Sequence, residues 1–356
     1  MKLLVAGGGT GGHVFPSLAV AREWLSRGAE REVVFVGTER GLEAKLVPQA
    51  GWPLEKIRSA GLKGIGGMRR VRNAAMLFPA LWDSAAILRR HRFAATFGMG
   101  GYAAGPVMLT AVMHFLPTVI FEPNAEPGFT NRVLANLVSR VATAHERAAE
   151  RLGHKAVVTG CPVRPEFFAC PPRAHTAPFH ILITGGSQGA LAINRAVVDA
   201  LDLLDVRKKE LLIVHQTGER DYNAVRVAYA RREFPAEVVP FLFNMAERFA
   251  QADLIVCRSG AITVAEVAAA GRAAIFIPFG AATDSHQLRN AQVLERAGAA
   301  RLIREDELTA ERVASEIFAL LDQPEQLREM EQRARQLARP RAAEDIVDLI
   351  EQVARR

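Results

Sequence analysis

Residues 2–13 read KLLVAGGGTGGH, a short apolar run followed by five glycines within six residues. The run Leu3 to Ala6 is typical of a buried strand, and the helix that we expect to begin near Pro16 carries an apolar stripe of Leu18, Ala21 and Leu25. Val33 to Val36 (VVFV) supplies the next strand. A strand, a glycine-rich loop, a helix and a second strand in this order predict the first unit of a parallel α/β sheet.

The same order recurs about half a chain later. His180 to Thr184 (HILIT) is followed by Gly185 to Gly189 (GGSQG), and Leu211 to His215 (LLIVH) follows the next helix. The buried face expected for that helix consists of Ile193, Val197, Ala200, Leu201 and Leu204. Because 356 residues also exceed the usual size of a single core, we predict two doubly wound, Rossmann-like domains that face each other across a cleft.

The domain boundary is expected in the proline-rich segment Gly160 to Pro178, which is typical of a stiff connector. We therefore predict a first domain over residues 1–160 and a second over residues 161–338. Residues 339–356 form a last amphipathic helix, which we expect to pack back on the first domain.

Composition narrows the class of protein. The three cysteines, Cys161, Cys170 and Cys257, lack metal-ligand spacing, which indicates a reducing compartment and no structural metal. No apolar stretch is long enough for a signal-peptide core or a transmembrane helix. The net charge of +7 suits an anionic membrane surface or a polyanionic small molecule. We expect no nucleic acid as a partner, because no motif of a nucleic-acid-binding domain is present.

Three glycine-rich turns follow predicted strands. They are Gly7 to Gly12, the cluster Gly98 to Gly105 after the strand Ala94 to Phe97, and Gly185 to Gly189. Ligands of open α/β sheets bind at the carboxyl ends of strands, and glycine lets backbone N–H groups approach a phosphate. A diphosphate ligand is therefore expected, although a tight turn without a ligand remains the alternative.

The first turn also matches the dinucleotide fingerprint Gly7-x-Gly9-x-x-Gly12. An NAD site would require an acidic residue at the end of the second strand, where Gly37 and Thr38 stand and Glu39 comes late. No loop ends in the Gly-Lys-Ser/Thr of a Walker A motif.

Polar residues follow other strands. Glu266, after the strand Asp253 to Cys257, suits the two hydroxyls of a ribose, or alternatively a first-turn interaction with the helix dipole. Glu122 and Asn124 suit either an acceptor or hydrogen bonds within their own loop. The residues that suit sugar hydroxyls are Asp284, His286, Gln287 and Asn290, although a helix cap at Asp284 or Ser285 is the alternative for part of them.

Taken in order, these motifs resemble the family 28 glycosyltransferases that use UDP-N-acetylglucosamine (UDP-GlcNAc). The matching blocks are Gly8 to Pro16, Gly98 to Tyr102, Gly160 to Arg164, Gly185 to Ala190, and Cys257 to Ala261 with Glu266. The resemblance implies a GT-B fold, an acceptor site in the N-terminal domain and a donor site in the C-terminal domain. It also implies a peripheral enzyme at the cytoplasmic face of the inner membrane that needs no cofactor.

The reaction that the resemblance implies moves N-acetylglucosamine (GlcNAc) from UDP-GlcNAc to the C4 hydroxyl of the N-acetylmuramic acid (MurNAc) unit of lipid I. Lipid I is undecaprenyl-pyrophosphoryl-MurNAc-pentapeptide, and the product is lipid II of peptidoglycan synthesis. The transfer inverts the configuration at the anomeric carbon.

The resemblance also assigns roles to residues. Glu266 holds the ribose, Ser187 and Gln188 meet the diphosphate, and Phe241 and Leu242 lie at the uracil. The complete set of expected donor contacts is Thr10, Gly11, Gly12, Asn124, Arg164, Ser187, Gln188, Phe241, Leu242, Glu266, His286 and Gln287. The acceptor and diphosphate loops contribute Gly9, Gly100, Gly101 and Tyr102. The chain departs from the family at Phe121 and Pro123, within the usual His-Glu-Gln-Asn, and at His286, where Gln is common.

Inversion requires a base at the acceptor hydroxyl and stabilisation of the departing UDP. His13 is the first candidate for the base, and a phosphate or backbone contact is its alternative role; Glu122 is the second candidate. Backbone N–H groups and Arg164 are expected to stabilise UDP. We expect no catalytic metal, because the chain has no Asp-x-Asp motif.

Residues 62–92 interleave basic and apolar side chains, which suits anionic lipid. The residues are Lys63, Arg69, Arg70, Arg72, Arg89, Arg90 and Arg92 with Met68, Met76, Leu77, Phe78, Leu81 and Trp82. The alternative is an ordinary helix that buries Leu and Trp under a solvated basic rim. Rival functions for the whole chain are a UDP-sugar epimerase of the same architecture, an NAD-dependent oxidoreductase and a sugar-nucleotide sensor without activity.

Overall fold

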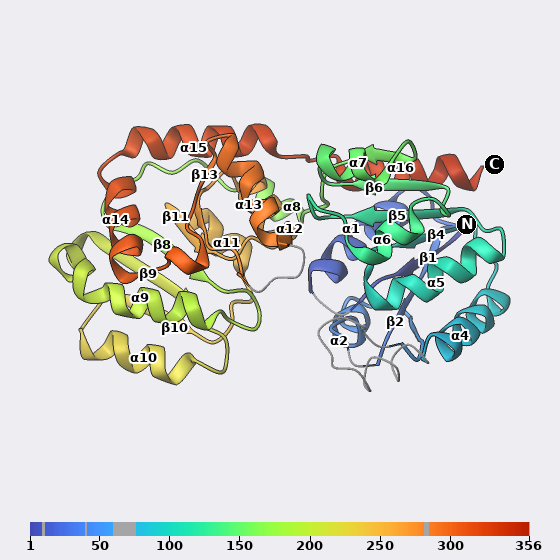
Figure 1. The fold of residues 1–356 in the computed structure, drawn as a ribbon, viewed down its shortest axis with the longest axis horizontal. Helices are drawn as coiled ribbons and strands as arrows, with labels where there is room; N and C mark the ends of the chain where they lie inside the picture. Colours follow the sequence, from blue (N-terminus) through green and yellow to red (C-terminus); the bar gives the residue numbers. More distant parts are fainter. Residues whose placement is uncertain (9–10, 40, 60–75, 281–284, 356) are drawn as a thin grey trace. The chain divides into compact units, whose positions relative to one another are not determined.

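The computed structural model describes residues 1–8, 11–39, 41–59, 76–280 and 285–355 (Figure 1). The chain divides into two compact units. Unit 1 comprises Met1–Val163 together with Arg339–Arg356, and unit 2 comprises Arg164–Ala338.

Unit 1 is built on a parallel sheet that, among the described residues, has seven strands in the order β3-β2-β1-β4-β5-β6-β7. The strands are β1 (Lys2–Ala6), β2 (Glu32–Gly37), β3 (Leu54–Lys56), β4 (Ala95–Gly98), β5 (Thr118–Glu122), β6 (Arg140–Thr143) and β7 (Ala156–Val158). Strand order reverses between β1 and β4, the point at which open α/β sheets form a ligand crevice. Ala6 pairs with both Val36 and Gly98, so these central strands end at one level.

The helices of unit 1 cover both faces of this sheet. They are α1 (Gly11–Ser26), α2 (Glu43–Gln49), α4 (Leu77–Arg90), α5 (Gly101–Met113), α6 (Phe129–Leu134), α7 (Glu146–Leu152) and α16 (Ala342–Ala354). α5 packs between α4 and α6, whereas α1 packs against α2 and α16. Arg27, directly after α1, pairs with Asp348 of α16 at 2.5 Å, so the last helix of the chain completes unit 1.

The prediction that the first helix begins near Pro16 is wrong, because α1 begins at Gly11 and contains Pro16. Glycines can wind the first turn directly at the edge of the sheet. Pro16 is the sixth residue of α1, past the N–H groups that lack helical partners, so the helix continues through it with one backbone hydrogen bond fewer. The earlier start places His13 in the first turn.

Unit 2 repeats the plan with a parallel sheet of six strands in its described part, in the order β10-β9-β8-β11-β12-β13. The strands are β8 (Phe179–Thr184), β9 (Leu211–Gln216), β10 (Ala236–Val239), β11 (Leu254–Cys257), β12 (Ala273–Phe276) and β13 (Ala300–Leu302). The order reverses between β8 and β11. Thr184 pairs with both Gln216 and Cys257, which again sets the ends of the central strands level.

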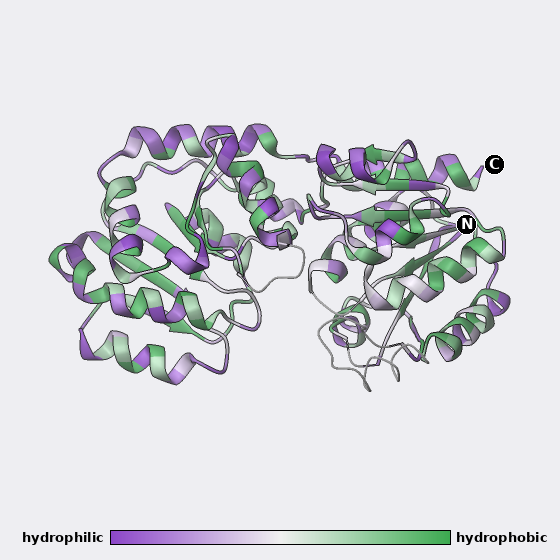
Figure 2. Cartoon of the chain, viewed as in Figure 1, coloured by the Kyte–Doolittle hydropathy of each residue, from purple (hydrophilic) through white to green (hydrophobic). Residues whose placement is uncertain are grey.

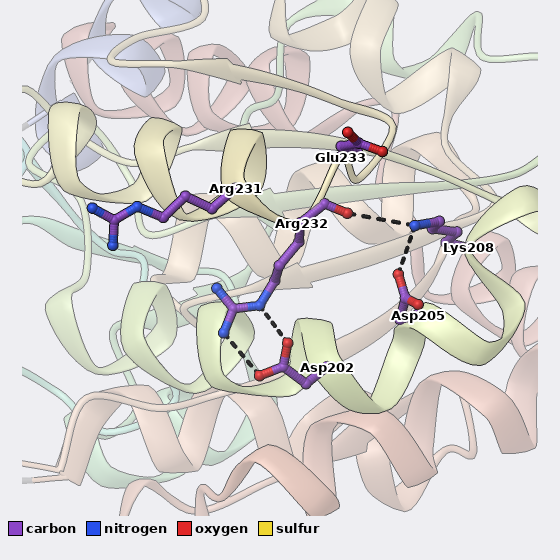
Figure 3. A pocket seen from close by; sticks show the side chains of 6 residues that line it. All are labelled: Asp202, Asp205, Lys208, Arg231, Arg232 and Glu233. Carbon is purple, nitrogen blue, oxygen red and sulfur yellow. Dashed lines mark hydrogen bonds and ion pairs between the residues drawn. The ribbon is translucent and has the colours of Figure 1, made fainter.

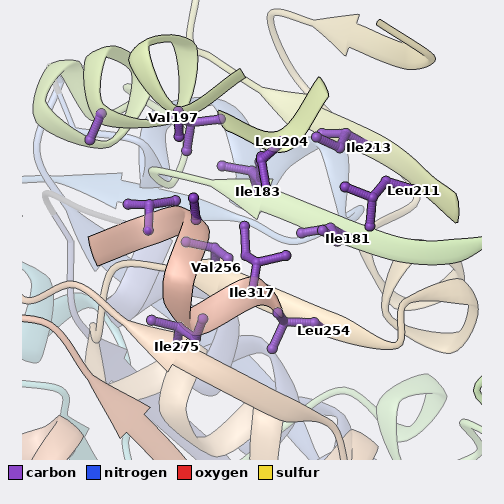
Figure 4. Packing of buried hydrophobic residues seen from close by; sticks show 14 of the residues in the cluster. Ile181, Ile183, Val197, Leu204, Leu211, Ile213, Leu254, Val256, Ile275 and Ile317 are labelled. Atoms are coloured by element: carbon purple, nitrogen blue, oxygen red, sulfur yellow. The ribbon is translucent and has the colours of Figure 1, made fainter. Parts of the chain in front are cut away.

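The α-helices of unit 2 are α8 (Pro165–Phe168), α9 (Leu191–Leu204), α10 (Tyr222–Arg231), α11 (Met245–Gln251), α12 (Ala261–Ala270), α13 (His286–Arg296), α14 (Ala310–Leu321) and α15 (Pro324–Leu337). Among the described residues of this unit there are also two short 3₁₀ helices, η1 (Asp205–Glu210) and η3 (Glu305–Glu307). Figure 4 shows the core in which Ile181 and Ile183 of β8 meet Val197 of α9 and Ile317 of α14. The predicted face of α9 is confirmed, since all five of its residues are buried.

A buried charge cluster ties the segment after α8 to unit 2. Asp253 accepts hydrogen bonds from Arg173, from Nδ1 of His175 and from the N–H of His180, at 2.9 to 3.0 Å. Nε2 of His175 lies 3.3 Å from the carboxylate of Glu331 in α15. Burial by itself lowers the pKa of His175, but its hydrogen bonds to Asp253 and Glu331 and their charges raise it to about 9.

Hydropathy follows burial in both units. Figure 2 shows hydrophobic strands, whereas α15 is hydrophilic over most of its length. No helix among the described residues is both long and apolar enough to cross a bilayer.

Candidate functional site

The first two glycine turns meet at the crevice between β1 and β4 of unit 1. A Cβ atom added at Gly101 would lie 3.5 Å from the carbonyl oxygen of Gly8 and 3.5 Å from Cε1 of His13. Gly100 and Gly101 have φ angles of +75° and +78°, which L side chains rarely adopt. Glycine at these positions therefore brings the start of α5 against the first turn of α1.

The imidazole of His13 lies against the backbone of the first glycine turn. Its Nδ1 lies 3.1 Å from the carbonyl oxygen of Gly8, so this nitrogen carries the proton and Nε2 is the basic atom. Burial lowers the pKa of His13 below 6.5, while the charge of Glu122, the Gly8 hydrogen bond and the charge of Glu43 oppose that shift. The imidazole is consequently neutral at pH 7.

The carboxylate of Glu122 is occupied within its own loop. Oε1 accepts from the backbone and side-chain N–H groups of Asn124, and Oε2 accepts from Gly128 N–H and from the side chain of Asn131, all at 2.9 Å. These four donors occupy the acceptor positions of both carboxylate oxygens. Glu122 therefore forms the hydrogen bonds within its own loop that were its alternative role.

Sequence reasoning missed Glu43. The carboxylate of Glu43, from α2, is buried near the end of β2, where a dinucleotide site would have an acidic residue. Glu39, the acidic residue closer in sequence to that strand, is exposed. Oε1 of Glu43 accepts from the N–H and the hydroxyl of Thr38, both at 2.9 Å. Cβ atoms added at Gly8 or Gly41 would lie within 2.3 Å of this carboxylate. The space for this side chain is left by Gly8, Gly37 and Gly41, which only the fold brings together around it.

The third glycine turn lies at the crevice of unit 2. Gly186, Ser187 and Gln188 are exposed, and α9 begins directly afterwards with no side chain capping it. A Cβ atom at Gly189 would lie 2.0 Å from the carbonyl oxygen of Thr217, so the turn packs closely on the loop after β9. Open backbone N–H groups at the start of a 14-residue helix suit an anionic diphosphate.

Glu266 and Arg164, which the sequence separates by about a hundred residues, lie together in unit 2. The guanidinium of Arg164 stacks over Phe167 at 4.9 Å and approaches Oε1 of Glu266 at 3.4 Å. Burial raises the pKa of Glu266 to about 7, although the charge and hydrogen bond of Arg164 oppose this. Glu266 is the sixth residue of α12, so the alternative of a first-turn dipole interaction is wrong.

The remaining donor residues surround the same edge of unit 2. Phe241 is 40% exposed after β10, and Leu242 is buried beside it. Oε1 of Gln287 accepts the N–H of Phe279 at 3.0 Å, and the amide NH₂ of Gln287 bonds to no described residue. His286 is the first residue of α13, and Ser285 precedes it without forming a side-chain cap.

Each predicted site residue belongs to one unit. Gly11, Gly12, His13, Gly100, Gly101, Tyr102, Glu122 and Asn124 lie in unit 1, and Arg164, Ser187, Gln188, Phe241, Leu242, Glu266, His286 and Gln287 lie in unit 2. Tyr102 is the second residue of α5, and its carbonyl oxygen accepts from Ser59 at 2.8 Å. Gly9, Thr10 and Asp284 lie outside the described residues.

α4 carries an exposed apolar face. Phe78 is 78% and Trp82 is 73% exposed, whereas the buried residues of this helix are Ala80, Ser84, Ile87 and Leu88. The alternative that α4 buries its tryptophan is therefore wrong. The basic residues predicted between positions 62 and 75, from Lys63 to Arg72, lie outside the described residues.

Two other features carry no comparable chemistry. In the part of the chain that the structure describes, no three His, Cys, Asp or Glu side chains converge as metal ligands. A shallow pocket beside α9 and α10 is lined by Asp202, Asp205, Lys208, Arg231, Arg232 and Glu233 (Figure 3). Four of its six charged side chains are paired with each other, since Arg232 pairs with Asp202 and Lys208 pairs with Asp205.

Known proteins share much of the sequence and the fold of this chain. The chain is 46% identical to a UDP-N-acetylglucosamine--N-acetylmuramyl-(pentapeptide) pyrophosphoryl-undecaprenol N-acetylglucosamine transferase of Myxococcus xanthus, over 98% of this chain and 92% of that protein. The crystal structure of Acinetobacter baumannii MurG superposes with a TM-score of 0.80 at 34% identity and covers 99% of both chains.

A UDP-GlcNAc 2-epimerase from Neisseria meningitidis, solved with bound UDP-GlcNAc, has a TM-score of 0.71 at 13% identity and covers 99% of this chain and all of that chain. A likeness at this identity shows a shared fold alone. Residues 3–143 match the glycosyltransferase family 28 N-terminal domain, and residues 180–348 match the family 28 C-terminal domain. Two doubly wound units with these matches constitute a GT-B fold, and the chain belongs to glycosyltransferase family 28.

Proposed function

We propose that this chain transfers GlcNAc from UDP-GlcNAc to the C4 hydroxyl of MurNAc in lipid I, forming lipid II with inversion. The observation that carries this proposal is the 46% identity, over 98% of the chain, to a protein whose name states this transfer. Two observations support it: unit 1 holds His13 as a candidate base, and unit 2 holds both an exposed glycine turn and the buried carboxylate of Glu266.

In this proposal unit 2 binds the donor, UDP-GlcNAc. The exposed turn Gly186 to Gln188 and the start of α9 would receive the diphosphate. Glu266 would accept both ribose hydroxyls once it is ionised, with Arg164 beside it as the positive charge near the phosphates. Phe241 presents an exposed ring for the uracil, and the NH₂ of Gln287 is available to a hydroxyl of the sugar.

Unit 1 is the acceptor side, and His13 is the proposed base. The acceptor oxygen forms a bond to C1 of GlcNAc, the bond from C1 to the phosphate oxygen breaks, and UDP leaves with the electron pair. The hydroxyl proton passes to Nε2 of His13, and the nearby charges of Glu122 and Glu43 stabilise the imidazolium that forms. Arg164 and the N–H groups of the third glycine turn stabilise the negative charge on UDP. The turn at Gly100, Gly101 and Tyr102 would hold the diphosphate of the lipid.

The proposal includes peripheral attachment to an anionic membrane on its cytoplasmic face. Phe78, Trp82 and Arg89 share one face of α4, because they follow at intervals of four and seven residues. Exposed aromatic rings with arginine on the same helix suit the boundary between head groups and acyl chains. Such attachment would bring unit 1 to the lipid-linked acceptor.

Proton NMR of UDP-GlcNAc separates transfer from epimerisation. Transfer predicts that donor is consumed, and that UDP and a β-linked product appear, only when a lipid I analogue is present. Conversion of UDP-GlcNAc to an epimer without any acceptor would show the alternative enzyme and overturn the proposal.

A further inference from the structure

Gln216 ends strand β9 and connects the two loops that the proposed donor site uses. Its side chain is 1% exposed. Nε2 donates to the carbonyl oxygen of Gly186 at 2.9 Å and to Oγ1 of Thr184 at 3.2 Å, and Oε1 accepts the N–H of Leu242 at 2.9 Å. One buried amide therefore joins the end of β8, the third glycine turn and the loop after β10.

The bonds on the donor side of the amide fix the shape of the glycine turn. Oγ1 of Thr184 also accepts the N–H of Gly186 at 3.2 Å, and the carbonyl oxygen of Gly186 also accepts the N–H of Gly189 at 2.9 Å. With that carbonyl oxygen held inward by two donors, Ser187 and Gln188 remain at the exposed crest of the turn, and their N–H groups bond to no described residue.

The bond on the acceptor side of the amide fixes the aromatic loop. Leu242 is buried between the exposed rings of Phe241 and Phe243, which lie edge to face with centroids 4.9 Å apart. Holding the N–H of Leu242 determines how far Phe241 stands from the turn at Gly186. No charged side chain supplies both a donor and an acceptor in this way. A buried apolar one would leave the N–H of Leu242 without this partner and would remove one of the two donors to the carbonyl oxygen of Gly186.

We propose that Gln216 is a positioning residue that sets the spacing between the diphosphate turn and the uracil loop. It does not touch the donor. Its role is to match the two loops to a single nucleoside diphosphate, so that the uracil and the diphosphate bind together more tightly than their separate affinities predict. The inference rests on the proposed function, in which unit 2 binds UDP-GlcNAc.

The test uses Gln216→Met, which keeps the volume of the side chain but removes all three hydrogen bonds. We expect the KM for UDP-GlcNAc to rise by about tenfold or more, as the loss of one well-placed hydrogen bond would produce, while kcat changes by less than about threefold. Calorimetry with uridine and with inorganic pyrophosphate should show affinities close to those of the wild type, and only UDP should bind more weakly.

Tyr229→Phe is the matched control. It removes the hydroxyl that contacts Nδ1 of buried His215 at 3.2 Å in the same unit, and that hydroxyl bonds to neither donor loop. We expect its KM to equal that of the wild type. An equal rise in KM for both variants would show that Gln216 acts only through stability, and a wild-type KM in Gln216→Met would also overturn the proposal.

Gln216→Glu tests the donor end and the acceptor end of the amide separately. It also replaces Gln216→Met as the test if that variant does not fold. Its carboxylate still accepts the N–H of Leu242 but repels the carbonyl oxygen of Gly186, so uridine binding should persist and pyrophosphate binding should fall. Equal loss of both, or of neither, contradicts the assignment. Failure of the wild-type chain itself to bind UDP-GlcNAc would instead refute the proposed function.

Discussion

Replacing Glu266 with glutamine should remove a pH dependence of UDP-GlcNAc binding that the structure predicts for the wild-type chain. Burial holds the pKa of Glu266 at about 7 in the unliganded protein. A carboxylate can accept both ribose hydroxyls only when it is ionised, because the protonated form must donate at one oxygen.

The magnitude follows from the populations of the two forms. With a pKa of about 7, roughly nine in ten Glu266 side chains are protonated at pH 6 and roughly one in ten at pH 8. If the ionised form binds the ribose, the apparent affinity rises by about tenfold from pH 6 to pH 8, or about 1.4 kcal/mol. Glu266→Gln should bind with one weak affinity at both pH values.

Isothermal titration calorimetry with UDP-GlcNAc measures this directly. The intact sugar nucleotide is preferable to UDP, whose terminal phosphate titrates near pH 6 and would add its own slope. His286→Gln serves as the control, because it removes the imidazole at the start of α13 and should leave the slope unchanged. A wild-type affinity that stays within twofold over this range, or a slope that persists in Glu266→Gln, would refute the assignment of Glu266 to the ribose.

Four further outcomes follow from the structure. His13→Ala should lower kcat by about 10²–10⁴-fold and leave the KM for UDP-GlcNAc within about threefold; equal turnover of variant and wild type from pH 6 to 9 would remove His13 as the base. Unit 2 should lose about 3 kcal/mol of stability as pH rises from 6.5 through 9, because the raised pKa of His175 stabilises the fold fully below pH 6.5, and His175→Gln should not show this loss. Far-UV circular dichroism during urea unfolding is suited to this measurement, since Trp24, Trp52 and Trp82 all belong to unit 1 and do not report on unit 2. Phe78→Ser with Trp82→Ser should reduce co-sedimentation with anionic vesicles by about tenfold or more, whereas Val206→Ser, an equally exposed change in unit 2, should not. Transfer activity should survive EDTA, and complete loss that Mg²⁺ or Mn²⁺ restores would show that the charge on UDP is met by a metal instead.

The features that sequence predicted best are those fixed by local chemistry. An apolar run that leads into glycines is typical of a strand that ends in a turn, so β1, β4 and β8 lie where the pattern indicates. The glycine clusters after β1 and β4 are not turns throughout, because α1 begins at Gly11 and α5 at Gly101. The start of α1 was misplaced because Pro16 is typical of a first helical turn, while the glycines before it gave no helical signal. Trp82 shows the converse limit, since an apolar residue on a helix does not reveal whether water, lipid or protein covers it.

Buried polar contacts were beyond the sequence because they join distant segments. The pairing of Arg164 with Glu266 was not predicted, although each residue was, because it depends on how α8 meets α12. Glu43 and Gln216 escaped notice for the same reason. Each is an ordinary polar residue in sequence, and only the fold shows which separate segments meet at its side chain.

Transfer of radiolabelled sugar to a lipid I analogue in anionic vesicles is the most direct measurement of what this chain does. Label from UDP-GlcNAc should enter the lipid fraction, and UDP-GalNAc or UDP-glucose should supply far less. If no label reaches the lipid from UDP-GlcNAc, or all three donors serve equally well, then the roles given to Glu266, His13 and the glycine turns do not describe this protein.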